Sequence, residues 1–112
     1  MVISGDKNSN RADAPTVAEM TIKRLLDSCP TNLGGVAFLS GGQSDDEATS
    51  HLNIMNASNK NLPWRVTFSY ARAIQQSALN YWRGKDANMS GAQEILASRA
   101  RACSDASVGS LS

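Results

Sequence analysis

A pair of adjacent glycines, Gly41 and Gly42, has the residue types that bind phosphate through the main chain. The pair follows a short apolar run and precedes a predicted helix that begins at Ser44. Glycines allow backbone N–H groups to approach a ligand closely, the positive end of the helix points the same way, and Ser40 adds a hydroxyl group. The alternative reading is a plain tight turn, which the same residues also form.

A second candidate, Ser69 and Arg72, follows the next apolar run along the chain. Arg72 falls in the first turn of a predicted helix, where a cation opposes the helix dipole at a cost of about 0.3–1 kcal/mol. An anion bound between the guanidinium group and the helix N-terminus would reverse the sign of that effect, and a phosphate suits both partners. The alternative is a surface arginine paired with a nearby carboxylate.

The two candidates are more informative together than apart. In (β/α)8 enzymes the phosphate site is commonly built from the loops after strands seven and eight and a helix N-terminus. Two successive strand ends that offer Ser-Gly-Gly and Ser-x-x-Arg match that description. The sequence therefore predicts a phosphate site made by Ser40, Gly41, Gly42, Ser69 and Arg72.

Other polar residues have simpler explanations. His51 falls inside a predicted helix without a nucleophile partner, which favours a surface or packing role. The acidic run from Asp45 to Glu47 is explained by helix capping. Lys85 follows a glycine in a polar stretch, which lacks the apolar surroundings that activate a Schiff-base lysine.

The elements that position these residues alternate between helix and strand. Periodicity, caps and breakers predict helices over 13–29, 44–57, 70–83 and 90–102, strands over 36–39 and 64–69, a loop over 1–12 and a mobile tail over 104–112. The run at 36–39 has no alternating polar residue, which predicts a strand covered on both faces.

Strand, helix and strand within roughly thirty residues make a βαβ unit, which is nearly always a right-handed parallel crossover. The fold class predicted from the sequence is therefore α/β. Two parallel strands alone would both be edges with unpaired backbone groups, so we expect the sheet to be completed by further strands.

Composition excludes several function classes. The 112 residues carry a formal net charge of +1 and 41% hydrophobic residues, without the clustered basic excess of a nucleic-acid binder. No stretch approaches the roughly 20 apolar residues that span a bilayer. Two separated cysteines and a single histidine do not supply the ligands of a structural zinc site. We therefore expect no nucleic acid, membrane or metal partner, and an intracellular location.

Several segments closely resemble the class I fructose-bisphosphate aldolases. Residues 38–44 (FLSGGQS) and 52–56 (LNIMN) are similar to the segment through strand seven of that family, and 67–75 (TFSYARAIQ) to its strand eight. The resemblance is colinear over nearly the whole chain.

The resemblance implies a fold and an activity. The fold would be the C-terminal portion of a (β/α)8 TIM barrel, comprising its last two parallel strands with their helices and forming one partial domain over 1–112. The family reversibly cleaves fructose 1,6-bisphosphate through a lysine Schiff base without a metal or other cofactor. By position, Ser40, Gly41, Gly42, Ser69 and Arg72 would bind the C1-phosphate. The parent enzyme would be a homotetramer, cytoplasmic or plastidic.

Three departures from the family pattern qualify this expectation. The Schiff-base lysine would lie upstream of Met1, so no catalytic residue is expected in this chain. Ala71 stands where the family commonly has glycine, and the chain stops at Ser112 without the terminal tyrosine of the family. The isolated chain is therefore expected to be inactive, and the alternative function is that of a truncated module with a phosphate-binding or assembly role.

Overall fold

A computed structural model describes residues 1–111 of the chain. The elements, in order, are α1 (Ala14–Ser28), β1 (Val36–Phe38), α2 (Asp45–Ser58), β2 (Val66–Phe68), α3 (Arg72–Trp82), a 3-10 turn η1 (Asp86–Asn88) and α4 (Met89–Ser107). This is the predicted alternation of helix and strand, and the α/β class is confirmed. Both strands are shorter than predicted.

The two strands pair in parallel and bring their carboxyl ends to one edge. Val36 lies opposite Val66 and Phe38 opposite Phe68. Backbone bonds beyond the ladder extend the pairing at both ends, from Val36 N to Arg65 O and from Ser69 N to Phe38 O, each 2.8 Å. The loops that come after β1 and β2 therefore start side by side.

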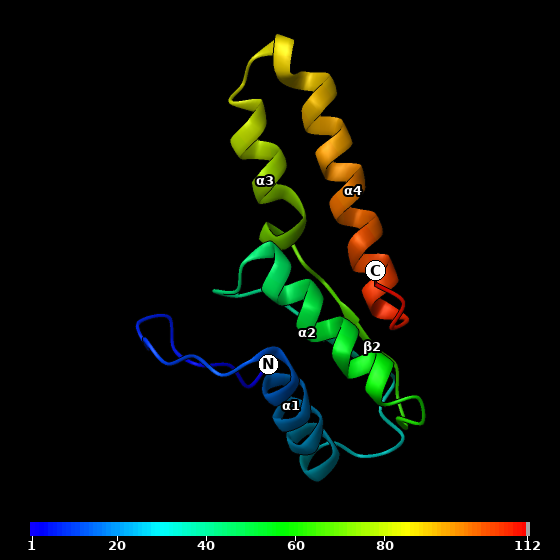
Figure 1. Ribbon diagram of the computed structural model, residues 1–112. Helices are drawn as coiled ribbons and strands as arrows, with labels where there is room; N and C mark the ends of the chain where they lie inside the picture. Colours follow the sequence, from blue (N-terminus) through cyan, green and yellow to red (C-terminus); the bar gives the residue numbers. More distant parts are fainter. Residues whose placement is uncertain (112) are drawn as a thin grey trace.

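Helix α2 is the central helix of the molecule. It lies between α1 on one side and the antiparallel hairpin of α3 and α4 on the other (Figure 1). Its side chains Ala48, Leu52 and Met55 are completely buried. The core around them joins residues from every major element: Ala18, Ile22, Phe38, Trp64, Val66, Tyr70, Ala73, Cys103 and Ala106.

The predicted helix starts are confirmed by their caps. The Asp13 carboxylate accepts a hydrogen bond from Thr16 N at the start of α1. Ser44 and Glu47 form the predicted capping box of α2, in which each side chain accepts a bond from the other residue's backbone N–H. These bonds satisfy donors that the first turn leaves unpaired, so both helices begin where the sequence indicates.

Helix α4 is longer than predicted. It continues to Ser107, so the segment from 104 to 107 is helical, and the prediction of a mobile tail is wrong for these residues. The reason is packing: Cys103 and Ala106 are completely buried, and the Asn56 amide donates to Ala106 O over 3.2 Å. Ser112, the last residue of the predicted tail, lies outside the described residues.

One face of the strand pair and one face of the hairpin are open to solvent. Ala37 is exposed and Leu39 is 72% exposed, so the prediction that both faces of the first strand are covered is wrong for this chain. On α3, the apolar side chains of Leu79 and Trp82 are also exposed. Regular spacing in the sequence places apolar residues on one face of a helix, but that face is buried only if a neighbouring element packs against it.

Among the described helices, none is long and apolar enough to cross a bilayer.

The core around α2 predicts that alanine substitutions at two leucines will change the free energy of unfolding by very different amounts. Replacing the fully buried Leu52 with alanine should lower the free energy of unfolding by about 2–5 kcal/mol, because it leaves a cavity. Leu39→Ala, at a mostly exposed position, is the matched control and should change stability far less. Urea unfolding followed by circular dichroism measures both. Equal effects of the two substitutions would contradict the central position of α2.

Candidate functional site

The glycine loop after β1 is a tight turn with a left-handed residue. Gly41 has φ +56°, a conformation that favours glycine because it has no Cβ. The turn is closed on the Ser40 carbonyl, which accepts bonds from the Gln43 backbone N–H at 3.1 Å and from Gln43 Nε2 at 2.9 Å. Two donors from one residue thus hold the carbonyl that precedes the glycine pair.

A buried histidine completes the anchor of this loop. His51 Nδ1 lies 2.7 Å from Gln43 Oε1, and both side chains are buried. Because Gln43 Nε2 donates to Ser40 O, its Oε1 is left as the acceptor that faces the imidazole, so Nδ1 carries the proton. Burial lowers the pKa of His51, which favours the neutral ring.

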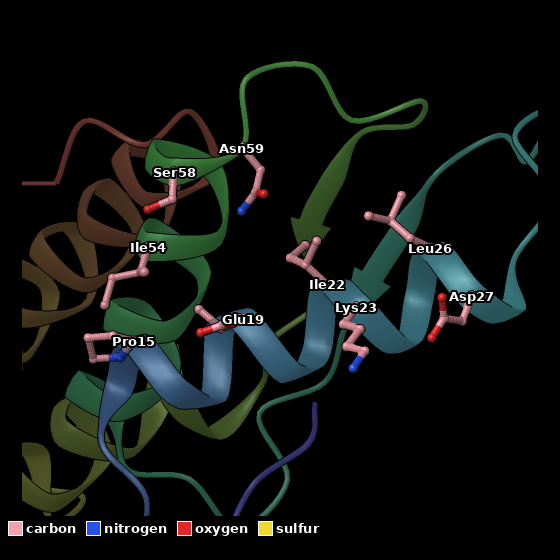
Figure 2. Close-up of a pocket in the computed structure, with 10 residues that line it drawn as sticks. Pro15, Glu19, Ile22, Lys23, Leu26, Asp27, Ile54, Ser58 and Asn59 are labelled. Carbon is pink, nitrogen blue, oxygen red and sulfur yellow. The ribbon is translucent and has the colours of Figure 1, made fainter.

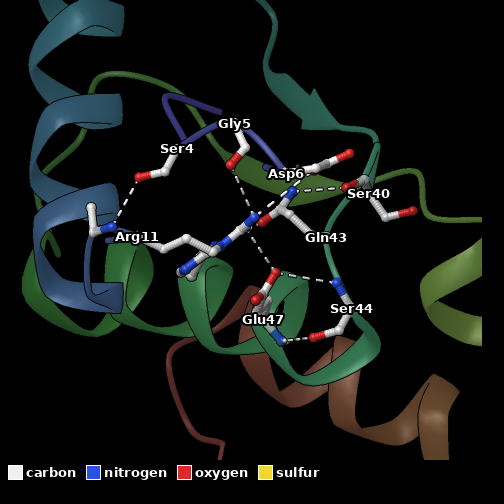
Figure 3. A network of polar contacts seen from close by, with 10 residues as sticks. Ser4, Gly5, Asp6, Arg11, Ser40, Gln43, Ser44 and Glu47 are labelled. Carbon is white, nitrogen blue, oxygen red and sulfur yellow. Dashed lines mark hydrogen bonds and ion pairs between the residues drawn. The ribbon is translucent and has the colours of Figure 1, made fainter. Parts of the chain in front are cut away.

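The N-terminal loop lies over the same turn (Figure 3). Arg11 donates to Glu47 Oε2 over 3.4 Å and lies 3.9 Å from the Asp6 carboxylate. The Asp6 carboxylate lies against Gly42, so closely that a Cβ built there would meet Oδ1 at 2.9 Å. Asp6, Arg11 and Glu47 thereby link the N-terminal loop to the glycine turn and to the first turn of α2.

The second candidate stretch is anchored by its tyrosine. The Tyr70 hydroxyl donates to Ala48 O over 2.9 Å, and burial raises the pKa of the phenol. Arg72 lies in the first turn of α3, as predicted, although the helix begins at Arg72 itself rather than at residue 70, and its side chain is exposed. Ala71 has φ −101° and ψ −70°, in the right-handed region that any L-residue adopts, so its methyl group imposes no backbone strain here.

Arg72 stands at a helix start that no side chain caps. The N-cap residue of α3 is Ala71, which makes no side-chain capping bond, unlike Ser44 on α2. Within residues 1–111, the Arg72 guanidinium group has no hydrogen bond or ion pair within bonding distance. A helix start without a side-chain cap and an exposed cation therefore lie together.

The structure brings three of the five predicted site residues into one pocket. Gly41, Gly42 and Arg72 line a depression of about 430 Å³, together with Gln43, Ser44, Asp45, Asp46, Gln76, Ser77 and Asn80. Ser69 is exposed and Ser40 is only 4% exposed, and neither is among the lining residues. The two serines lie at the paired strand ends that support the two loops.

Sequence reasoning missed the residues that hold these loops. The sequence analysis gives no role to Gln43, Tyr70 or Arg99. Arg99 follows Ile95 by four residues and Leu96 by three, and this spacing on an apolar helix face could have indicated a partly buried arginine. His51 has the packing role that was one of its two expected alternatives. Lys85 is exposed.

A further pocket, of about 560 Å³, lies between α1 and α2, away from the strand ends (Figure 2). Its lining is part apolar and part charged: Pro15, Ala18, Glu19, Ile22, Lys23, Leu26, Asp27, Ile54, Ser58 and Asn59. Over residues 1–111, no three His, Cys, Asp or Glu side chains gather as a metal site would require. None of the predicted site residues lines this pocket, so the strand ends remain the best candidate site.

Comparison with known proteins identifies relatives over the whole chain. The family model described as glycolytic, fructose-bisphosphate aldolase class-I, matches residues 1–112. A cytoplasmic fructose-bisphosphate aldolase isozyme of Spinacia oleracea is 42% identical over 108 residues, which are 96% of this chain and 30% of that protein. The chloroplastic fructose-bisphosphate aldolase 1 of Chlamydomonas reinhardtii is 48% identical, over 97% of this chain and 28% of that protein.

A solved structure agrees with these matches. The fructose-bisphosphate aldolase of Plasmodium falciparum, crystallised with TRAP and a small molecule inhibitor, superposes with a TM-score of 0.92 at 43% identity. The match covers 100% of this chain and 32% of that one. The chain thus spans about 30% of the length of the curated relatives it matches, and these relatives include both cytoplasmic and chloroplastic proteins.

The contact between His51 and Gln43, together with burial of the ring, predicts the tautomer of His51 and the direction of its pKa shift. At pH 7 its ring should be neutral with the proton on Nδ1, and its pKa should lie below the usual 6.5. Because folding lowers this pKa, the associated stability is present above pH 6.5 and is lost as the pH falls through the folded-state value. Nitrogen-15 NMR of the ring measures both.

The variant Gln43→Leu, which lacks the acceptor, is the control and should lose the preference for the Nδ1–H tautomer. A wild-type ring protonated on Nε2 would contradict the proposed Gln43 orientation.

Proposed function

The chain belongs to the family of class I fructose-bisphosphate aldolases, and on that premise we propose that it is part of a lyase of glycolysis and gluconeogenesis. The reaction is the reversible cleavage of fructose 1,6-bisphosphate to dihydroxyacetone phosphate and glyceraldehyde 3-phosphate. These residues contribute the C1-phosphate-binding end of the active site. The observation that carries this role is the position of Arg72, unpaired within the described structure and in one pocket with Gly41 and Gly42.

The proposed binding mode follows from the chemistry of the groups. A phosphate accepts two parallel N–H bonds from a guanidinium fork, which Arg72 offers without competition from a described carboxylate partner. The uncapped N-terminus of α3 adds backbone donors and the positive end of a dipole. Gly41 and Gly42 add further amide groups, and Ser40 and Ser69, at the strand ends, complete the proposed set through their hydroxyls.

We propose that the two parallel strands are the last two strands of a (β/α)8 barrel. The parallel pairing with a helical crossover is the repeating unit of such a barrel. The open strand edges and the exposed Leu39 and Trp82 favour packing against further elements. Residues 1–112 are then part of one domain, with 1–12 as a loop.

The covalent step requires an activated lysine, and burial in an apolar pocket is one way in which proteins activate it. All four lysines of the chain (Lys7, Lys23, Lys60 and Lys85) are exposed. We therefore place the Schiff-base lysine outside these 112 residues. As the family resemblance implies, the proposed reaction uses no metal or other cofactor. The parent enzyme is proposed to be a homotetramer of the cytoplasm, with a plastid as the alternative compartment.

A second candidate function is that of a catalytically inactive module that binds phosphate or assembles with other chains. One observation favours it: an apolar pocket of about 400 Å³ on the α3–α4 hairpin opens to solvent. Its lining includes Leu79, Trp82, Met89 and Leu96, all of which are exposed. Such a surface is suited to protein contact.

Phosphate binding predicts a specific loss in Arg72→Ala. Charge-assisted hydrogen bonds contribute about 1.5–3 kcal/mol, so the affinity of the chain for fructose 1,6-bisphosphate should fall about 10- to 100-fold. Isothermal titration calorimetry measures the dissociation constant. Arg24→Ala, an exposed arginine on α1, is the matched control and should bind as the wild type does. An unchanged affinity in Arg72→Ala would exclude this residue from the site.

The missing nucleophile predicts that the purified 112-residue chain does not cleave fructose 1,6-bisphosphate. A coupled assay for triose phosphates should give only the background rate, and borohydride should trap no adduct on the chain. The positive control is a full-length aldolase under the same conditions. Turnover that is lost in Lys85→Met would place the Schiff base in this chain and overturn the proposal.

A further inference from the structure

Arg99, on α4, contacts the first turns of both helices that carry the candidate site. Its Nη2 donates to Asp45 O, at the first residue of α2, over 2.8 Å and also to the Thr49 hydroxyl. Its Nε donates to Ala73 O, at the second residue of α3, over 3.1 Å. One guanidinium group on a third helix thus joins the starts of the other two.

These two helix starts set the geometry of the pocket. The glycine pair is separated from α2 only by Gln43 and Ser44, and Arg72 is the first residue of α3. The distance between the glycine amides and the Arg72 guanidinium group therefore depends on how the two first turns are held. The Ser77 hydroxyl strengthens the same junction, because it donates to the Asp45 carboxylate from α3.

Arg99 also offsets negative charge beside the pocket. Asp45 and Asp46 line it together with Arg72, and two carboxylates would repel a bound phosphate. Arg99 Nε lies 3.8 Å from Asp45 Oδ2, and Nη1 lies 3.6 Å from Asp46 Oδ1. Since the Arg99 and Asp45 side chains are only 15% and 20% exposed, this pair is screened less than a surface pair, whereas the fully exposed Asp46 gains little.

We propose that Arg99 is a positioning residue of the phosphate site, which holds the glycine loop and Arg72 at the spacing a phosphate requires and offsets the charge of Asp45. This role rests on the proposed phosphate-binding function. Arg99 does not line the pocket, so it acts through Asp45 and Ala73 rather than by touching the ligand.

The test uses the whole 112-residue chain and inorganic phosphate, with fructose 1,6-bisphosphate as a second probe. Proton–nitrogen NMR follows the amides of Gly41, Gly42 and Arg72, first without ligand and then during titration. We expect Arg99→Gln to shift these amides in the free chain, to speed hydrogen exchange in the first turns of α2 and α3, and to weaken phosphate binding about tenfold.

Arg99→Lys separates the two parts of the role. Lysine restores a positive charge opposite Asp45 but not the planar fork that reaches three acceptors, so its affinity should lie between those of the wild type and Arg99→Gln. The control is Arg101→Gln, an exposed arginine on the same helix, which should match the wild type in every measurement. If Arg99→Gln does not fold, the exchange and titration of Arg99→Lys decide the question.

The ligand-free and titration data distinguish failure of this role from failure of the proposed function. If the wild-type chain shows no shift with either probe, the phosphate-binding function is wrong. If wild type binds and Arg99→Gln binds equally well, with unchanged Gly41, Gly42 and Arg72 amides in the free chain, Arg99 has no positioning role. Altered free-state amides and exchange, with intermediate values in Arg99→Lys, support it.

Discussion

The parallel pairing of β1 with β2 is the constraint on which the rest of the structure depends. Parallel strands joined by a helix must present their carboxyl ends at the same edge. The bond from Ser69 N to Phe38 O shows this directly, since it joins the last paired residue of one strand to the first loop residue after the other. Without that register, the glycine pair and Arg72, about thirty residues apart, would have no reason to share a pocket.

Packing on α2 converts this shared edge into a defined geometry. Its completely buried Leu52 and Met55 hold the helix against the strands, while polar contacts fix the turn after each strand. His51 holds the turn after β1 through Gln43, and Ala48 O holds the turn after β2 by accepting the Tyr70 hydroxyl bond. Both loops are thus fastened to one helix, which limits their relative movement.

Several apolar side chains of the chain are exposed to solvent. Leu39, Leu79 and Trp82 are apolar and exposed, which is costly for an isolated chain and ordinary for a segment that packs against other elements. The chain matches only about 30% of the length of its curated relatives. The proposed role, a phosphate-binding end that works with a nucleophile outside these residues, agrees with these open surfaces.

Local interactions determined what could be predicted from the sequence alone. Caps such as Ser44 with Glu47 act over three residues, so helix starts, element order and the place of Arg72 in a first turn follow from spacing. Tertiary structure decided the rest. Arg99 and Asp45 are in contact although 54 residues separate them in the sequence. Helix α4 continues past residue 104 because Ala106 is buried in the core. Ser40 is buried, whereas Ser69 is exposed. Such contacts depend on how the elements pack against one another, and the local spacing of residues in the sequence does not reveal this packing.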